Sequence, residues 1–348
     1  MLNIPHFSLI FLLVFFSFSS NSKPNIEPFF GSGANIYDQA TCFRKPFDTY
    51  DSWLAMMQQS MNKRAKTEVE SNERLAKFKS TFPSSSFDNF KAAIDCITFK
   101  YKVGEEEVNG YLIRPKGKED LPIIVYNRGG NGNFGAMVFG GLMNRLMPLA
   151  EKGFVIVGSQ YRGTFQRGGL LKDEFGGADV EDVVSLVKKL KYLNHADINS
   201  IGMYGTSRGG MQSLLALKEL DDIVKSVALR AGNYDLQRDL STRPEMELVY
   251  KKRIPNYATQ KDEQLRKRSA LYWAGEINNA IPVLLQHGDN DQKVNVYNSK
   301  ALAEKFSEAS RPYKLTIYED DDHGLSNHSD EAFNELVQWF MMHLKQNK

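Results

Sequence analysis

The chain has 348 residues, of which 42% are hydrophobic and 25% charged, a globular composition with enough length for one large domain and an accessory segment. Its 44 Lys and Arg residues nearly balance its 42 Asp and Glu residues, so that the net charge is only +2. This balance argues against a dedicated nucleic-acid-binding protein.

The N-terminus carries an apolar run at 9–18, LIFLLVFFSF, followed by small polar residues. The run is too short to span a bilayer but fits the apolar core of a signal peptide covering 1–22, with cleavage after Ser19 or Ser22. The expected location is therefore secreted or periplasmic, with no stable membrane span after signal removal. A short membrane anchor is the alternative interpretation.

Two cysteines, Cys42 and Cys96, are the complete set in the sequence. Export would permit them to pair, but spacing alone leaves their pairing open. Two cysteines without a nearby histidine cluster give no support for a zinc site.

Residues 23–95 are predicted to form a helical N-terminal segment. Residues 49–82 are rich in Met, Lys, Glu and Ala and contain no Gly or Pro, which indicates one long or two shorter helices. Apolar residues then alternate with polar ones over 97–103, the period of a half-buried strand, and a second strand is expected over about 107–114.

From residue 96 to 348 the pattern alternates strands with helices and predicts a mostly parallel, doubly wound α/β sheet. Ligands bind such sheets beyond the carboxyl ends of the strands. Residues of about 236–275 interrupt the alternation and are expected to form a helical cap over the site. The expected strands are at 121–126, 154–159, 201–204, 224–230, 282–287 and 313–318.

The motif GTSRGG contains Gly205, Ser207 and Gly209, which fit the G-x-S-x-G nucleophile elbow. A predicted strand precedes it and an apolar helix follows, so the Ser207 hydroxyl should project from a tight turn above the sheet. Because a serine alcohol is a weak nucleophile, it needs a histidine base and a carboxylate that orients this base.

The two remaining partners are expected downstream, in the order serine, acid, histidine. Asp291 lies in HGDND after one predicted strand, and His323 lies in EDDDHG after the next. Asp289 and Asp235 are alternative acids. The run Asp320 to Asp322 is interpreted as a solvated charge run, His287 as the end of a strand, and His195, His328 and His343 as surface residues.

Several ordered motifs resemble the catalytic domain of the prolyl oligopeptidase family of serine peptidases. They are YRGT at 161–164, FGGADVEDV at 175–183, GTSRGG, HGDND with Val294, and the terminal DHG. The resemblance covers about 103 to the C-terminus and implies an α/β-hydrolase fold with Ser207 as nucleophile, Asp291 as orienting acid and His323 as general base. It also implies hydrolysis of a peptide bond without a metal or an organic cofactor.

The chain departs from the family in two ways. Family members usually carry a large N-terminal β-propeller, whereas fewer than 100 residues lie between the predicted signal and the catalytic region. The loop VYNRGGNG resembles the family's oxyanion loop but has Arg128 where members commonly have Tyr or His. The Arg208 backbone N–H is expected to supply one oxyanion donor, and the second is open between the Arg128 side chain and a backbone amide near Gly130. Arg128 could equally have a structural role or bind a substrate carboxylate.

The expected substrate is a small peptide, with a carboxylesterase on the same fold as the main alternative and a non-catalytic binding protein as the third hypothesis. The predicted cap should determine specificity. Its basic residues Arg243, Lys251, Lys252 and Arg253 could bind an acidic substrate or form a solvated helix face. The sequence leaves the oligomeric state open.

Overall fold

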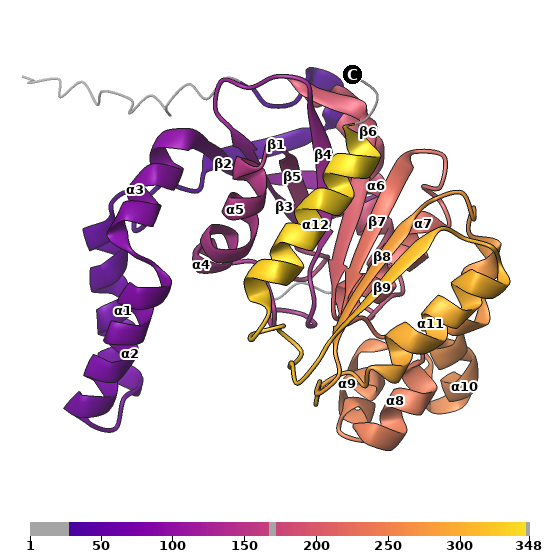
Figure 1. The fold of residues 1–348 in the computed structure, drawn as a ribbon. Helices are drawn as coiled ribbons and strands as arrows, with labels where there is room; N and C mark the ends of the chain where they lie inside the picture. Colours follow the sequence, from indigo (N-terminus) through magenta and orange to yellow (C-terminus); the bar gives the residue numbers. More distant parts are fainter. Residues whose placement is uncertain (1–27, 167–171, 346–348) are drawn as a thin grey trace, which may run out of the picture.

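A computed structural model describes residues 28–166 and 172–345 of the chain (Figure 1). The predicted signal peptide at 1–22 lies outside these residues. Within the described ranges, no helix combines the length and the apolar character needed to cross a bilayer.

In the described part of the chain, nine strands form one sheet with the order β1-β2-β3-β5-β4-β6-β7-β8-β9. The strands from β5 to β9 pair in parallel, whereas the pairs β1–β2, β2–β3 and β3–β5 are antiparallel. The predicted mostly parallel, doubly wound sheet is therefore confirmed. The strands are β1 (Ile36–Thr41), β2 (Ile94–Val103), β3 (Glu106–Pro115), β4 (Leu121–Asn127), β5 (Val155–Ser159), β6 (Ala196–Thr206), β7 (Val224–Arg230), β8 (Val283–Gly288) and β9 (Tyr313–Tyr318).

The central strands are apolar because both faces of the sheet are covered. In β4, Ile123 and Val125 belong to the hydrophobic core on one face, while Ile124 and Tyr126 belong to the core on the other. Successive side chains of a strand point to opposite faces, so a strand buried on both faces reads as a continuous apolar run.

Helices cover the two faces of this sheet. The first face packs against α6 (Val180–Lys189), α7 (Arg208–Leu217) and α11 (Tyr297–Glu308), and the second against α5 (Met147–Glu151) and α12 (Ser329–Leu344). In α6, Val183, Val184 and Val187 lie at helical spacing and are buried against this face. Figure 1 shows α12 running across its face of the sheet.

Three helices follow β7 in the predicted cap region: α8 (Leu236–Thr242), α9 (Met246–Arg253) and α10 (Tyr257–Arg268), with short 3₁₀ turns η4 (Ala270–Tyr272) and η5 (Ala274–Glu276). They lie below β7 to β9 in Figure 1, beyond one end of these strands. Met211 and Leu215 of α7 pack against the apolar side chains of these helices, so the cap is anchored on the helix that follows the elbow.

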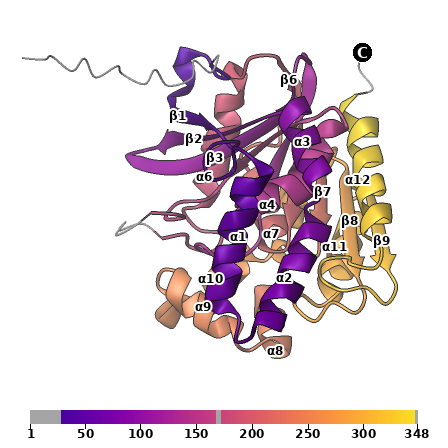
Figure 2. The same cartoon turned by 90° about the vertical axis from the view of Figure 1, so that its left-hand side faces the viewer.

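The N-terminal segment contains α1 (Tyr50–Arg64), α2 (Glu68–Thr81) and α3 (Ser84–Ala93), and α1 and α2 form a hairpin along one side of the molecule (Figure 2). The prediction of a purely helical segment was wrong for β1, which extends the sheet by pairing with β2. The sequence of β1 lacks a clear alternation, and its strand conformation depends on this pairing.

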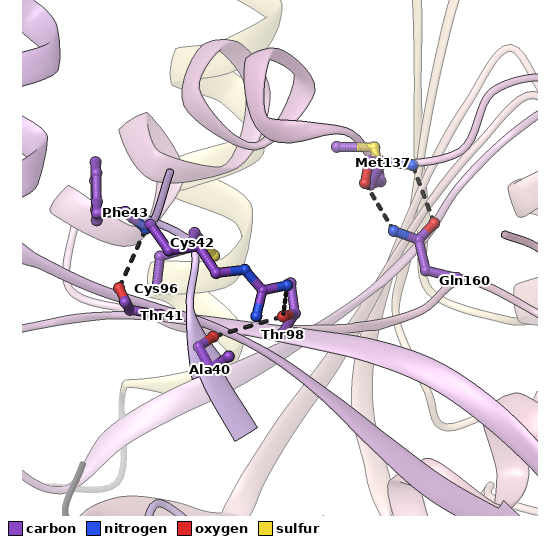
Figure 3. The surroundings of a disulfide bond; sticks show 9 residues. Ala40, Thr41, Cys42, Phe43, Cys96, Thr98, Met137 and Gln160 are labelled. Atoms are coloured by element: carbon purple, nitrogen blue, oxygen red, sulfur yellow. Dashed lines mark hydrogen bonds between the residues drawn. A yellow bond between two sulfur atoms is a disulfide. The ribbon is translucent and has the colours of Figure 1, made fainter. Parts of the chain in front are cut away.

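Two features tie the N-terminal segment to the sheet. Cys42, just after β1, forms a disulfide with Cys96 of β2 (Figure 3), which answers the question that the sequence left open. Trp53 of α1 is buried and contacts the rings of Phe78, Phe87 and Phe139 edge-on or tilted. Because Phe139 follows the loop after β4, this aromatic cluster joins the helical hairpin to that loop.

Candidate active site

Ser207 lies in a sharp turn between β6 and α7. Its φ of 55° and ψ of −128° are unusual for a residue with a side chain, a strain that is typical of functional positions. A side chain at Gly205 would run into the Gly209 carbonyl, and one at Gly209 into the Asn127 carbonyl. The turn therefore requires both glycines of the motif, and its backbone is anchored by a bond of 2.8 Å from the Ser207 N–H to the Arg230 carbonyl.

Asp291 and His323 are in direct contact, although they follow different strands. The His323 Nδ1 atom lies 2.6 Å from Asp291 Oδ2. The Asp291 side chain is fully buried, whereas the His323 side chain keeps 19% of its surface exposed. The histidine is therefore oriented by a carboxylate and still reaches solvent.

The Asp291 carboxylate accepts hydrogen bonds at both oxygens. Its Oδ1 atom accepts the backbone N–H groups of Lys293 at 2.7 Å and Val294 at 3.0 Å. Burial alone would raise the pKa of Asp291, but hydrogen bonds from the His287 and His323 rings outweigh burial and hold this pKa well below its usual value. Asp291 is therefore ionised at neutral pH.

Neither alternative acid contacts His323 among the described residues. Asp289 is exposed, and the Asp235 carboxylate instead accepts the Arg238 N–H at 3.1 Å as the N-cap of α8. Of the three acids that the sequence offered, Asp291 is the one that the structure brings to the histidine.

Within the described ranges, Ser207 and His323 do not form a hydrogen bond with each other. Ser207 follows β6 and His323 follows β9, and both strands end at the same edge of the parallel sheet. Catalytic hydrogen bonds of ligand-free enzymes are often long and tighten only when substrate binds.

The loop that carries His323 is held by a buried carboxylate. Asp321 accepts the backbone N–H groups of Asn327 at 3.1 Å and His328 at 3.0 Å, and its Oδ2 atom lies 2.9 Å from the His328 ring. The prediction of a solvated charge run was therefore wrong for Asp321. Its carboxylate is buried because the loop folds back to present backbone N–H groups to it, and the local sequence pattern does not reveal this fold.

The Arg128 side chain is committed to the loop after β4. It is buried, and its guanidinium donates to the carbonyls of Gly129, Gly132, Phe134 and Gln160 and to the Thr164 hydroxyl. Because its N–H groups bind these acceptors, the guanidinium has a structural role, which is one of the alternatives that the sequence left open.

Gly129 of the same loop approaches Ser207 closely. A Cβ atom added at this position would lie 3.0 Å from Ser207 Cβ and 3.6 Å from its Oγ. Backbone groups of this loop therefore lie close to the Ser207 hydroxyl.

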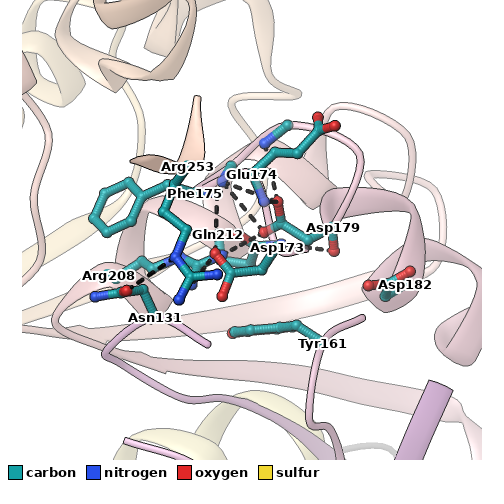
Figure 4. Close-up of polar contacts among 12 residues, drawn as sticks. Asn131, Tyr161, Asp173, Glu174, Phe175, Asp179, Asp182, Arg208, Gln212 and Arg253 are labelled. Atoms are coloured by element: carbon teal, nitrogen blue, oxygen red, sulfur yellow. Dashed lines mark hydrogen bonds and ion pairs between the residues drawn. The ribbon is translucent and has the colours of Figure 1, made fainter. Parts of the chain in front are cut away.

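A buried ionic network lies beneath this loop (Figure 4). The Arg208 guanidinium donates to the Gly130 carbonyl at 2.9 Å and pairs with Asp173 at 3.2 Å and Asp179 at 2.5 Å. Asp173 also accepts the Gly132 N–H. The Arg208 side chain, next to Ser207 in the sequence, thus holds the loop that faces Ser207.

Two details of this network are not visible in the sequence. Nothing in the local pattern singles out Asp173, because its partners Gly132 and Arg208 are distant in the sequence. Asp179 precedes α6 but makes no side-chain cap to it, because its carboxylate turns back to accept the N–H groups of Glu174, Gly176 and Gly177. Burial would raise the pKa of Asp179, and the Arg208 charge with these N–H groups lowers it overall.

The cap contacts the same loop through Arg253 at the end of α9. Its Nε atom lies 3.2 Å from the Asn131 side-chain oxygen, and its guanidinium packs against Gly132. Two other basic residues of the cap lie beside acidic side chains instead: Arg243 pairs with Glu245, and Lys251 lies 3.7 Å from Glu247.

Across 28–166 and 172–345, no group of three or more metal-ligating side chains comes together.

The site combines a strained serine at a strand-turn-helix elbow with an aspartate-bound histidine, both at the carboxyl ends of strands in a mostly parallel sheet. This combination defines an α/β-hydrolase. The model of the prolyl oligopeptidase family matches residues 141–347, which is more than half of the chain. The chain therefore belongs to the prolyl oligopeptidase family and is an enzyme of the serine peptidase class.

Individual relatives agree with this membership. The chain is 28% identical over 262 residues to the uncharacterized peptidase YtmA of Bacillus subtilis, covering 75% of this chain and 97% of that protein. It is 24% identical over 254 residues to the uncharacterized peptidase YuxL of the same organism, covering 68% of this chain but 37% of that protein.

A solved structure of similar fold is the acylaminoacyl peptidase of Pyrococcus horikoshii, with a TM-score of 0.62 and 23% identity. The match covers 75% of this chain and 44% of that chain, so this chain spans less than half of these longer relatives. At this identity the likeness shows the fold alone.

Proposed function

We propose that the protein hydrolyses peptide bonds by acyl transfer through Ser207, His323 and Asp291. The observation that carries the proposal is the contact of 2.6 Å between Asp291 and His323 at the sheet edge where the Ser207 elbow also lies. This combination fits the roles of orienting acid, general base and nucleophile.

In the proposed reaction, the Ser207 Oγ atom bonds to the substrate carbonyl carbon while His323 Nε2 takes the hydroxyl proton. The C–N bond then breaks, and His323 returns the proton to the leaving amine. Water repeats the sequence on the acyl-enzyme and releases the acid. Asp291 stays ionised and stabilises the imidazolium.

The developing oxyanion is proposed to lie between the Arg208 backbone N–H and a backbone amide of the Gly129–Gly130 loop. The proximity of Gly129 to Ser207 supports the loop amide. The Arg128 side chain is not proposed as a donor, because its N–H groups already bind loop carbonyls.

Export to an oxidising compartment is part of the proposal. The Cys42–Cys96 disulfide supports it, since such bonds are rare in the reducing cytosol. The division into a signal peptide at 1–22, an N-terminal segment at 23–95 and a catalytic domain at 96–348 is proposed with it. Mass spectrometry of protein recovered outside the cytoplasm should show a mature N-terminus near residue 20 or 23.

The activity is tested by comparing kcat/KM on aminoacyl or dipeptidyl p-nitroanilides and on short-chain p-nitrophenyl esters, with Ser207→Ala as the control. Anilide hydrolysis that disappears in Ser207→Ala supports the peptidase. Ester hydrolysis alone would favour the carboxylesterase, and anilide hydrolysis that survives in Ser207→Ala would contradict the proposed nucleophile.

A further inference from the structure

A second histidine contacts the proposed catalytic acid. His287 is fully buried at the end of β8, and its Nε2 atom lies 3.1 Å from Asp291 Oδ2, the oxygen that His323 also contacts. From the sequence, His287 was expected only to end a strand. Its place on Asp291 gives it a role that the proposed triad does not include.

The neighbours of His287 define which ring nitrogen carries a proton. Nε2 also lies 3.0 Å from the Val294 carbonyl, and neither this oxygen nor the ionised Asp291 carboxylate can donate a hydrogen. Nε2 must therefore be the donor. Nδ1 lies 2.7 Å from the Ser299 hydroxyl, which donates to it when the ring is neutral.

These contacts form a chain of hydrogen bonds from α11 to the proposed base, running from Ser299 through His287 and Asp291 to His323. Asp291 Oδ2 receives an N–H from each ring, while Oδ1 receives two backbone N–H groups. All the acceptor positions of a carboxylate are thus used, and its orientation is defined from four directions.

We propose that His287 is a positioning residue for Asp291, holding its Oδ2 atom toward His323 and taking up part of its negative charge. This inference rests on the proposed function, because it assumes that Asp291 orients the catalytic base. The charged and polar groups that face His287 are Asp291, the Ser299 hydroxyl on α11 and, at longer range, Asp239 on α8.

Because His287 takes up part of the negative charge of Asp291, its removal should change how the rate depends on pH. When the His287 donor is absent, the whole charge of Asp291 acts on His323 and favours its protonated form. The rate at low pH should then fall earlier, and the acidic midpoint of the kcat/KM profile should move upward by about half a pH unit.

Two amide variants separate this role from simple packing. In His287→Gln the side-chain amide reaches the place of Nε2 and can still donate to Asp291. In His287→Asn the shorter amide reaches only the place of Nδ1, near Ser299. Both variants remove the ring and keep a polar group, so they should cost similar stability.

We expect His287→Asn to lower kcat about ten-fold with little change in KM and to raise the acidic midpoint, because a loosened orienting group misplaces the base. His287→Gln should stay within about three-fold of the wild type with an unchanged midpoint. Thermal unfolding of both variants measures the loss of packing separately.

The proposal is overturned if the two variants have the same kcat, or if His287→Asn leaves the midpoint where it is in the wild type. Ser207→Ala, measured on the same substrate, tests the proposed function independently. If Ser207→Ala is inactive while the His287 variants do not differ, the triad stands and the positioning role falls.

Discussion

At the residue scale, the buried Asp291 carboxylate should be indispensable for turnover. Asp291→Asn keeps the shape of the side chain but allows the wrong histidine tautomer, so kcat should fall by about 10³- to 10⁴-fold. Anilide kinetics measure this loss. Asp289→Asn, two positions away and exposed, should retain wild-type rates, and equal losses in both variants would contradict the assignment of Asp291.

The same carboxylate predicts how stability changes with pH. Its folded-state pKa is lower than the unfolded value of about 4, so its ionisation stabilises the fold above that pH, and this stability is lost as pH falls through the folded-state pKa. The difference in free energy of unfolding between Asp289→Asn and Asp291→Asn should therefore be largest near pH 7 and shrink below about pH 4. Urea titrations at pH 7, 5 and 3 measure it, and a difference independent of pH would refute this contribution.

The charge of Arg128 suggested that this residue binds a substrate, but its buried hydrogen bonds give it a structural role. Arg128→Met keeps the bulk but leaves several buried carbonyls without donors, which should lower the free energy of unfolding by about 2–4 kcal/mol. Urea denaturation tests this against Arg266→Met, a change at an exposed arginine. A loss no larger than in Arg266→Met would be inconsistent with the buried hydrogen bonds.

At the element scale, the cap and the loop after β4 should act together in catalysis. Arg253 of α9 contacts Asn131 in this loop, so Arg253→Ala should loosen the proposed oxyanion donors and lower kcat about ten-fold. Lys252→Ala is a matched control, because Lys252 is the exposed neighbour on the same helix. Kinetics identical in the two variants would mean that the contact is not used in turnover.

At the scale of the whole molecule, the disulfide joins the N-terminal segment to the sheet across 54 residues of sequence. Replacing both cysteines with serine should lower the free energy of unfolding by about 4 kcal/mol through the closed-loop entropy. Urea denaturation with and without a reductant measures it. Reductant should shift the wild type toward the double variant and leave the double variant unchanged, and a wild type insensitive to complete reduction would contradict the contribution.

The sheet could be predicted because its signals are local. Buried parallel strands are continuous apolar runs, so the strands at 121–126 and 154–159 were predicted to within one residue of the bounds that β4 and β5 have. The elbow was equally visible, since its glycines are required within five residues. β1 was missed because its mixed sequence gains a strand conformation only by pairing with β2.

By itself, the sequence determined the fold class, the family resemblance and the candidates Ser207, Asp291 and His323, because these depend on periodicity and on motifs within short segments. Only the tertiary structure brought Asp291, and neither of its alternatives, to His323, paired Cys42 with Cys96, and placed the Arg128 guanidinium among loop carbonyls. It also revealed His287 on Asp291 and Asp173 beneath the loop. Hydrogen bonds between residues distant in the chain depend on how strands and loops meet in space, and no local pattern encodes that meeting.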